Sequence, residues 1–422
     1  MSNYENSPLL GAAEGRKPLW KDNRPYVRWP ANICRLTWIF AASSNINALL
    51  VFVPVGSVAG ARSWNPTAVF TLNFLAIIPL SVLLTFVINE LSAGLNRPWK
   101  ELFSVMLTNS VKIIVNVIAV QYNEIRVAQS CMLGTIFSNM LLILGSCFLA
   151  GGIRSQESNF NVAAASTMSS LMVIASVSLV IPATLDAALH NSKSGSRDKI
   201  VMLSRGTAVI LLLIYILYLY FRLISHASLF NEEQAERSEE ARQSHQTISP
   251  IASIIALVIV LVAIAISAHF LIGSISPLFK TTHISKTFIG LILLPILGNG
   301  KERITAISVA YKGQMNLGID VAIGSSIQIA LFVTPFLVIL SWIIHTADPM
   351  TLHFQRFETI IFFVSVLVVN SLIQDGKSNY LEGALCLGTY IIIALAFHLY
   401  PDDAGDVETI VGVLGVREGV RE

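Results

Sequence analysis

The chain contains about eleven apolar runs of close to 20 residues each, and this feature restricts the fold more than any other. A helix of that length crosses the hydrocarbon core of a bilayer. The composition agrees, since 54% of the 422 residues are hydrophobic and 13% are charged, against roughly 25% charged in soluble domains. We therefore predict an all-α, polytopic membrane protein with about 11 transmembrane helices.

The expected helices divide into one leading helix and two groups of five. We place them at roughly 35–58, 66–90, 101–121, 127–150, 161–186, 203–225, 249–275, 285–311, 317–345, 356–373 and 379–399. Because five is odd, the two groups must enter the membrane from opposite sides, as inverted repeats do in many secondary transporters. The predicted architecture is one helix followed by two inverted five-helix repeats.

The segments between and around these groups complete the domain organisation. We expect a cytoplasmic N-terminal tail (1–34), a first transmembrane helix (35–58), a first repeat (66–225), an acidic cytoplasmic linker (226–248), a second repeat (249–399) and a C-terminal tail (400–422). Basic residues in the N-terminal tail favour its cytoplasmic placement. The linker's glutamates share a helical face, which fits either a solvated connection or a surface that attracts cations.

Two polar motifs recur at one separation. Asn109 and Asn299 are 190 residues apart, and so are Gly134-Thr135 and Gly324-Ser325, which indicates an internal duplication. In the second copy Glu302 lies one helical turn after Asn299, so both project from one face. An amide oxygen and a carboxylate suit Ca²⁺ or a similar cation. Asn299 and Glu302 are therefore the candidate metal ligands, and an acidic residue inside an apolar run is a functional candidate by default.

The duplication is imperfect at one position, where the first copy has Lys112 in place of the second copy's Glu302. One reading pairs the Lys112 ammonium with Glu302, where it takes the place of a cation. The other lets the long lysine stem snorkel away from the site. His269 has two readings as well, a proton carrier near neutral pH or a hydrogen-bonded packing residue. Ser325 and Gln328 offer oxygens in the next span, although such residues also serve helix packing.

The stretch from Phe288 to Trp342 resembles the second signature repeat of the vacuolar Ca²⁺/H⁺ exchangers of the calcium/cation antiporter superfamily, and is closest to fungal members. Gly298-Asn299 with Glu302 and the run from Gly324 to Pro335 carry the resemblance. Further support comes from three segments, Leu372 to Gly383, Ser204 to Ala208 and Tyr218 to Phe221.

This resemblance implies eleven helices, alternating access, and movement of Ca²⁺ or a related cation into the vacuole in exchange for H⁺. Carried over by position, the cation- and proton-binding residues are Asn109, Gln129, Asn299, Glu302, Ser325 and Gln328. The sequence departs from the family pattern at Thr108, Lys112, His269, Gly273, Lys301 and Arg303. Apart from Thr108, which stands for a glycine, each departure removes negative charge or adds positive charge, so Lys112 and His269 are expected to modify the site.

Two functions follow, a vacuolar cation/proton antiporter and a paralogue that keeps the fold for regulation or assembly without transport. A channel fits less well, because paired inverted repeats around one midplane site favour alternating access. We expect no enzyme, because no nucleophile–base set or phosphate-binding loop is present, and we expect no bound cofactor and no nucleic acid. The expected partners are the cation, H⁺ and the lipid bilayer, and the sequence leaves open whether the chain forms a homo-oligomer.

Overall fold

The computed structural model describes residues 49–93, 95–189, 196–230, 250–282, 284–298, 300–344 and 349–400. All of these residues belong to one unit that begins at Leu49. Several expectations fall outside them. These are the N-terminal tail, the first part of the leading helix, most of the acidic linker, the C-terminal tail beyond Tyr400, and Asn299.

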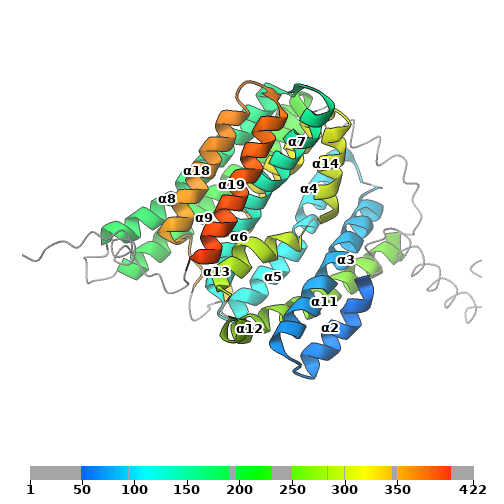
Figure 1. The fold of residues 1–422 in the computed structure, drawn as a ribbon, viewed down its shortest axis with the longest axis vertical. Coiled ribbons are helices and arrows are strands. Elements are labelled where there is room, and N and C mark those ends of the chain that lie inside the picture. Colours follow the sequence, from blue (N-terminus) through cyan, green and yellow to red (C-terminus); the bar gives the residue numbers. More distant parts are fainter. Residues whose placement is uncertain are drawn as a thin grey trace, which may run out of the picture. The chain divides into compact units, whose positions relative to one another are not determined.

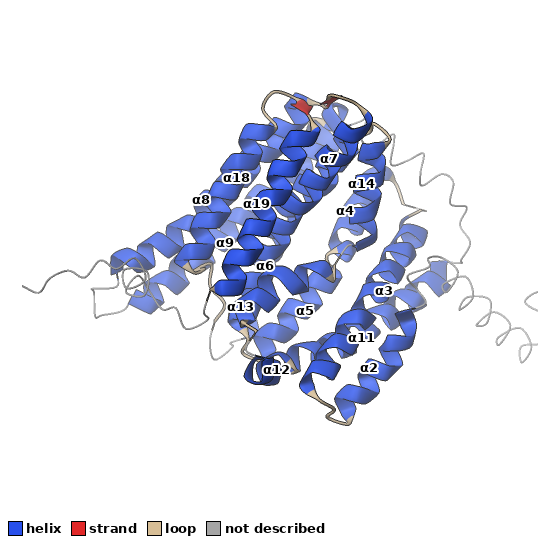
Figure 2. Ribbon diagram, in the orientation of Figure 1, coloured by secondary structure: helices blue, strands red, loops and turns tan. Residues whose placement is uncertain are grey.

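Helices make up nearly all of the described chain, which confirms the all-α prediction (Figure 2). In the described residues the only strands are β1 (Ser158–Asn159) and β2 (Lys377–Ser378), which pair antiparallel at one end of the bundle. Beside them the exposed Glu157 carboxylate accepts a hydrogen bond from the Lys377 ammonium at 3.0 Å. This contact raises the pKa of Lys377.

The leading helix ends as α2 (Phe52–Ala61). The first repeat then comprises α3 (Pro66–Ser92), α4 (Arg97–Thr108), α5 (Ser110–Gln121), α6 (Ile125–Phe137), η3 (Ser138–Ile143), α7 (Leu144–Arg154), α8 (Val162–Leu189), α9 (Ser196–Tyr220), η4 (Phe221–Ser225) and η5 (Ala227–Phe230). Local signals set the start of α3, because Pro66 occupies its first turn and the Asn65 side chain accepts a hydrogen bond from the Thr67 amide.

The second repeat follows the linker. It comprises α11 (Pro250–Gly273), α12 (Ile275–Thr282), α13 (Lys286–Phe288), η6 (Ile289–Leu293), η7 (Leu294–Ile296), α14 (Gly300–Tyr311), α15 (Met315–Ile319), η8 (Asp320–Gly324), α16 (Ser325–Gln328), η9 (Ile329–Val333), α17 (Thr334–Ile344), α18 (Arg356–Leu372) and α19 (Tyr380–Leu399). Here η3, η4, η6, η8 and η9 are π-helical turns, whereas η5 and η7 are 3₁₀ turns.

Eight helical segments of the described chain are long and apolar enough to cross a membrane, counting α4 and α5 together as one. Three of the expected spans are not among them. The leading helix is described only from Leu49, the span at 285–311 is interrupted before Gly300, and α18 has 17 residues. The described helices are consistent with about eleven spans.

The duplication is visible in the element boundaries. Both ends of α5 and both ends of α14 are 190 residues apart, and the same holds for α7 and α17. The π-helical turn η3 also has a counterpart, η9, at the equivalent place after α16. The repeats are inverted, since α5 runs towards the lower end of the view in Figure 1 and α14 towards the upper end.

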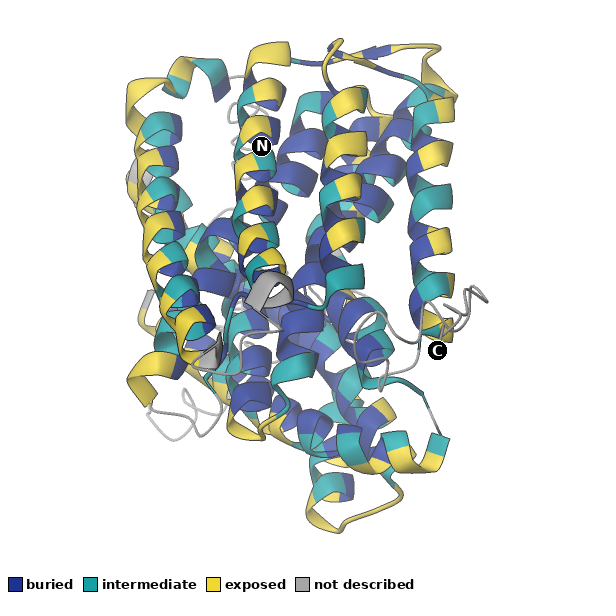
Figure 3. Cartoon of the chain, turned by 90° about the vertical axis from the view of Figure 1, so that its left-hand side faces the viewer, coloured by how far each residue is buried: buried dark blue, intermediate teal, exposed yellow. Residues whose placement is uncertain are grey.

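Contacts at the two ends agree with the inversion. The end of α14 lies against the end of α7, where Arg154 donates a hydrogen bond to the Tyr311 carbonyl at 3.1 Å. The end of α5 lies instead against α11, where the Tyr122 hydroxyl meets the His269 ring at 3.1 Å. Buried residues face the interior of the helix assembly and exposed residues form stripes along its outer helices (Figure 3). Those stripes carry large apolar side chains such as Leu217, Ile259 and Ile392, as expected of a lipid-facing surface.

Candidate functional site

The helix between residues 97 and 121 is interrupted at Asn109, and this residue joins the two repeats. Its side chain is fully buried. The Nδ2 group donates one hydrogen bond to the Val105 carbonyl at 2.9 Å and another to Oε1 of Gln328 at 2.8 Å. The first repeat's interruption therefore lies directly against α16 of the second repeat.

Lys112 lies one turn further along, and its side chain points into the protein. The residue is 5% exposed, and its Nζ donates to Oδ1 of Asn109 at 3.2 Å. The lysine stem packs on Gly298, where an added Cβ would come within 3.1 Å of the Lys112 Cε. The Lys112 side chain therefore extends to the interruption of the second repeat, and it does not snorkel outward to the membrane surface. Because Gly298 has no side chain, there is space beside it, and the Lys112 side chain fills that space.

The second interruption, ahead of Gly300, is held by Arg303. This guanidinium is largely buried, and its Nη2 donates to the Pro295 carbonyl at 2.8 Å and to Oδ1 of Asn139 at 3.4 Å. Glu302, in the first turn of α14, acts electrostatically on both Lys112 and Arg303. The positive end of the helix dipole favours a carboxylate at this place. Two cationic side chains therefore lie within electrostatic range of one carboxylate.

Ser325 and Gln328 occupy the two ends of the short helix α16. They are three residues apart on one helical face and are both half-buried. The π-helical turns η8 and η9 lie directly before and after α16, and such turns are frequent at functional sites. The Gln328 side chain is the direct link to Asn109.

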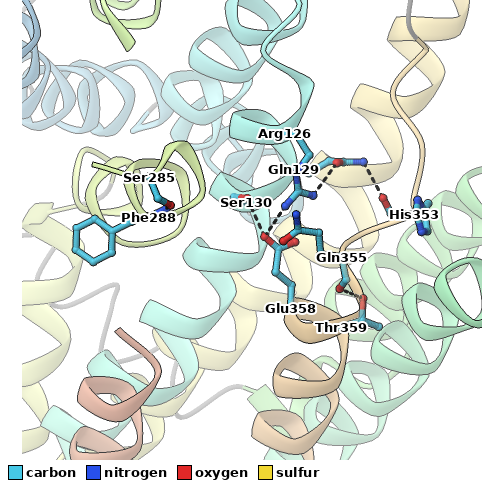
Figure 4. A network of polar contacts seen from close by, with 9 residues as sticks. All are labelled: Arg126, Gln129, Ser130, Ser285, Phe288, His353, Gln355, Glu358 and Thr359. Atoms are coloured by element: carbon cyan, nitrogen blue, oxygen red, sulfur yellow. Dashed lines mark hydrogen bonds and ion pairs between the residues drawn. The ribbon is translucent and has the colours of Figure 1, made fainter. Parts of the chain in front are cut away.

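Gln129 and His269 lie apart from this group. The Nε2 of Gln129 donates to the backbone carbonyls of Thr351 and His353, both at 3.0 Å, and Figure 4 shows the bond to His353. His269 is exposed and meets the hydroxyl of Tyr122. Tyr122 follows Lys112 by ten residues, or about 15 Å along a helix. The contact of His269 with Tyr122 agrees with the packing interpretation of His269, and the Gln129 side chain connects α6 to residues 351–353.

The geometry joins Asn109, Lys112 and Gln328 by hydrogen bonds, and Glu302 acts electrostatically on Lys112. Ser325 lies one turn before Gln328 in α16, and Asn299 lies outside the described residues. The oxygens of Asn109, Glu302 and Gln328 are of the type that binds hard cations. The Asn109 oxygen, however, already accepts a hydrogen bond from the Lys112 ammonium. Within the described part of the chain, no cluster of three His, Cys, Asp or Glu side chains forms an additional metal site.

Comparison with known proteins agrees with this architecture. The sodium/calcium exchanger protein family matches residues 65–224 and 252–399. The chain belongs to this family.

Curated relatives of this exchanger are similar over most of their length. The vacuolar calcium ion transporter of Schizosaccharomyces pombe is 44% identical over 94% of both chains. The Ca²⁺/H⁺ antiporter of Synechocystis is 35% identical over 84% of this exchanger and 96% of its own chain. The vacuolar cation/proton exchanger 2 of rice is 35% identical over 86% of this exchanger and 84% of its own chain.

Solved structures agree at the level of the fold. The structure of native YfkE has a TM-score of 0.70 and 27% identity, and covers 84% of this exchanger and all of its own chain. The H⁺/Ca²⁺ exchanger CAX has a TM-score of 0.60, covering 84% of this exchanger and 91% of its own chain. At 11% identity, CAX supports the fold alone.

Four charged residues of the exchanger were missed by the sequence reasoning. Arg126 and Glu358 form one ion pair at 3.0 Å, and Arg222 and Asp320 form another at 2.6 Å. Both acidic residues lie inside expected spans and are buried. The rule that singled out Glu302, an acidic residue in an apolar run, would have found them if it had been applied to every span.

Proposed function

We propose that this exchanger is a secondary active antiporter that moves Ca²⁺, or a related cation, into the vacuole in exchange for H⁺. The observation that carries the proposal is the buried polar centre where the two interrupted helices meet. Asn109 of one repeat bonds Gln328 of the other, and the Glu302 carboxylate acts electrostatically on the neighbouring Lys112. Interrupted helices facing each other between inverted repeats are the usual place for ion sites in secondary transporters.

The names of the relatives support the same function. The transporter of S. pombe is called a vacuolar calcium ion transporter, and the Synechocystis and rice relatives are called cation/proton exchangers or antiporters. Membrane helices with a lipid-facing surface agree with a multi-pass protein of the vacuolar membrane. The cytoplasmic N-terminus expected from the basic residues of the tail belongs to this proposal too.

The alternative, a paralogue without transport, rests on Lys112. Its ammonium contacts the Asn109 oxygen that would otherwise face a cation. The relatives' names favour transport over this alternative. In the antiporter, the cation competes with the ammonium for that oxygen, so Lys112 lowers the affinity of the site without removing the pathway.

Purified exchanger in sealed vesicles with an acidic interior provides the test. We expect uptake of ⁴⁵Ca²⁺ that stops when an ionophore collapses the pH gradient. Competition with other divalent and monovalent cations would then rank the substrates. Absence of pH-driven uptake of every tested cation, by protein whose thermal unfolding is cooperative, would contradict the proposal.

A further inference from the structure

Two ion pairs with buried carboxylates connect the repeats. We call two helical segments the inner helices. They are α6 in the first repeat and the run of α15, η8 and α16 in the second repeat. The first pair joins Arg126 of an inner helix to Glu358 in the first turn of α18. The second joins Asp320 of the other inner helix to Arg222 in η4. Each pair thus links an inner helix of one repeat to an outer helix of the other.

The first pair is part of a larger network, shown in Figure 4. The Glu358 side chain is fully buried, and its Oε1 accepts hydrogen bonds from Arg126 and from the Ser130 hydroxyl, both at 3.0 Å. Gln129 adds its two bonds to the carbonyls of Thr351 and His353. Three side chains from the first two turns of α6 therefore hold one short stretch of the second repeat.

In the second pair, both terminal nitrogens of the guanidinium face the carboxylate, and one of them donates a hydrogen bond to it. Nη1 of Arg222 lies 2.6 Å from Oδ1 of Asp320, and Nη2 donates to Oδ2 at 2.9 Å. The Tyr218 hydroxyl accepts a further hydrogen bond from Nη1 at 2.9 Å. Planar two-point contacts of this kind fix orientation as well as distance.

One residue of each network occupies the same position in the duplication. Ser130, which contacts Glu358, and Asp320 are 190 residues apart, and each is the sixth residue of its inner helix. Each precedes by four residues the glycine of its repeat motif, Gly134 or Gly324. The charges are placed the opposite way round in the two pairs. The first inner helix supplies the cationic residue of its pair, whereas the second supplies the carboxylate. Since the repeats are inverted, the pairs lie on opposite sides of the polar centre.

We propose that the Arg126–Glu358 and Arg222–Asp320 pairs are positioning ties, which set the height and rotation of the inner helices and so of the residues they present to the centre. Ser325 and Gln328 follow Asp320 by five and eight residues in the same helical run. A helix turns by about 100° per residue, so a slip of one residue at the tie would turn the Gln328 amide away from Asn109. Removing one partner would also leave a buried charge without its counter-charge.

The ties differ in their access to water. The Arg126 side chain is 36% exposed, whereas that of Arg222 is 10% exposed. Water competes for the guanidinium of the first tie, and such pairs are weaker than dry ones. We therefore expect variants at Asp320 to have larger effects than variants at Arg126.

A native cysteine reports on the first tie without any transport measurement. Cys131 follows Ser130 in α6 and is buried, as are Cys147 in α7 and Cys386 in α19. In the full-length protein, Glu358→Gln and the milder Arg126→Gln should speed alkylation of Cys131 by N-ethylmaleimide about tenfold through local opening. Cys147 and Cys386 should keep their wild-type rates. An unchanged alkylation rate at Cys131, or an equal rise in the rates at Cys131, Cys147 and Cys386, would contradict the positioning role of the Arg126–Glu358 pair.

The second tie is measured by uptake, and this part rests on the proposed function. Asp320→Asn should raise the KM for Ca²⁺ about tenfold, as expected when binding groups are misplaced, with the maximal rate nearly unchanged. Arg222→Lys, which keeps the charge, should be milder. The matched control is Glu157→Gln with Lys377→Gln, because that exposed pair also joins the repeats. A lower maximal rate at unchanged KM would refute positioning. If the wild-type protein takes up no Ca²⁺, only the proposed function is refuted. The alkylation rates of Cys131 would still test the role of the Arg126–Glu358 pair.

Discussion

Lys112 and Glu302 determine the charge of the polar centre, and both can be tested by single substitutions. The lysine ammonium contacts Asn109, its stem fills the space over Gly298, and the Glu302 carboxylate acts on it from the other repeat. A divalent cation that entered this arrangement would add two charges next to two cationic side chains. Unbalanced buried charge is costly, so the affinity for Ca²⁺ depends on what stands at residue 112.

Replacing Lys112 by glutamate should strengthen Ca²⁺ binding by roughly tenfold or more, because the change removes a competing ammonium and adds a carboxylate ligand. Calorimetry on purified wild type and Lys112→Glu measures the difference. Lys112→Met is the informative control, since it removes the charge without adding a ligand and should give an intermediate affinity. Equal Ca²⁺ affinities for wild type and Lys112→Glu would show that the ammonium does not contribute to the binding site.

Glu302 supplies the carboxylate of this group, so Glu302→Gln should abolish proton-coupled uptake while the protein still inserts and folds. The reason is that the neutral amide of glutamine offers no counter-charge for the cation and, unlike a carboxyl group, does not bind and release a proton in the physiological pH range. Uptake in vesicles is measured beside Glu157→Gln, which alters a carboxylate that is 61% exposed far from the centre in the fold. Wild-type uptake by Glu302→Gln would refute the assignment, and loss of the folded protein would assign Glu302 a structural role.

Residue identity could be predicted where two copies of a motif were available for comparison. The duplication drew attention to Asn109, Lys112 and Gln328, and the structure brings these three together. It gave no signal for Asp320 or Glu358, because their partners, Arg222 and Arg126, are distant in sequence and have no repeated pattern. It also could not show that the guanidinium of Arg303 turns back to the Pro295 carbonyl, since that depends on the three-dimensional course of the interrupted helix.

At the scale of elements, two glycines let the repeats approach closely. The backbone of Leu291 lies so near Gly134 that an added Cβ would be 2.0 Å from the Leu291 carbonyl oxygen. On the other helix, an added Cβ at Gly290 would be 2.9 Å from both the Val127 carbonyl oxygen and the Ser130 Cβ. Such small-residue crossings let membrane helices pack backbone to backbone. The crossing keeps α6 against the interrupted helix of the second repeat.

Gly134→Ala should therefore destabilise the protein by about 2 kcal/mol or more, because backbone must move to admit the methyl group. Gly206→Ala is the matched control. Gly206 lies in α9 with open space around its virtual Cβ, and there alanine should stabilise the helix by about 1 kcal/mol. Thermal unfolding in detergent compares the two variants. A Gly134→Ala protein as stable as wild type would mean that the crossing is looser than the structure indicates.

Helix positions were largely predictable, whereas their irregularities were not. Apolar length gave the spans. Near Asn299 the sequence does contain residues that weaken a helix, namely Pro295 and the glycines Gly298 and Gly300 on either side of Asn299. The π-helical turns η3 and η9 leave no sequence pattern of their own, since a π-helical turn depends on how the neighbouring helices pack. The interruption at Asn109 has no proline or glycine in the sequence beside it, and it follows from the tertiary contact with Gln328.

At the scale of the whole molecule, the inverted repeats give the exchanger two quasi-equivalent faces. The turn after α5 and the turn after α14 correspond through the 190-residue offset, and both are exposed. Each turn follows a half-helix that begins at the polar centre. A path from one face to the centre therefore has a counterpart from the other face, as alternating access requires.

The last prediction fixes the direction of these faces. If the N-terminal tail is cytoplasmic, counting the spans places the turn after α5 in the lumen and the turn after α14 in the cytoplasm. Asn123→Cys and Lys312→Cys lie in these two exposed turns. On sealed right-side-out vacuoles, a membrane-impermeant maleimide should label Lys312→Cys and should spare Asn123→Cys until detergent opens the membrane. Reversed labelling would keep the inverted fold and turn the molecule over, whereas labelling of both sites from one side would contradict the inversion itself.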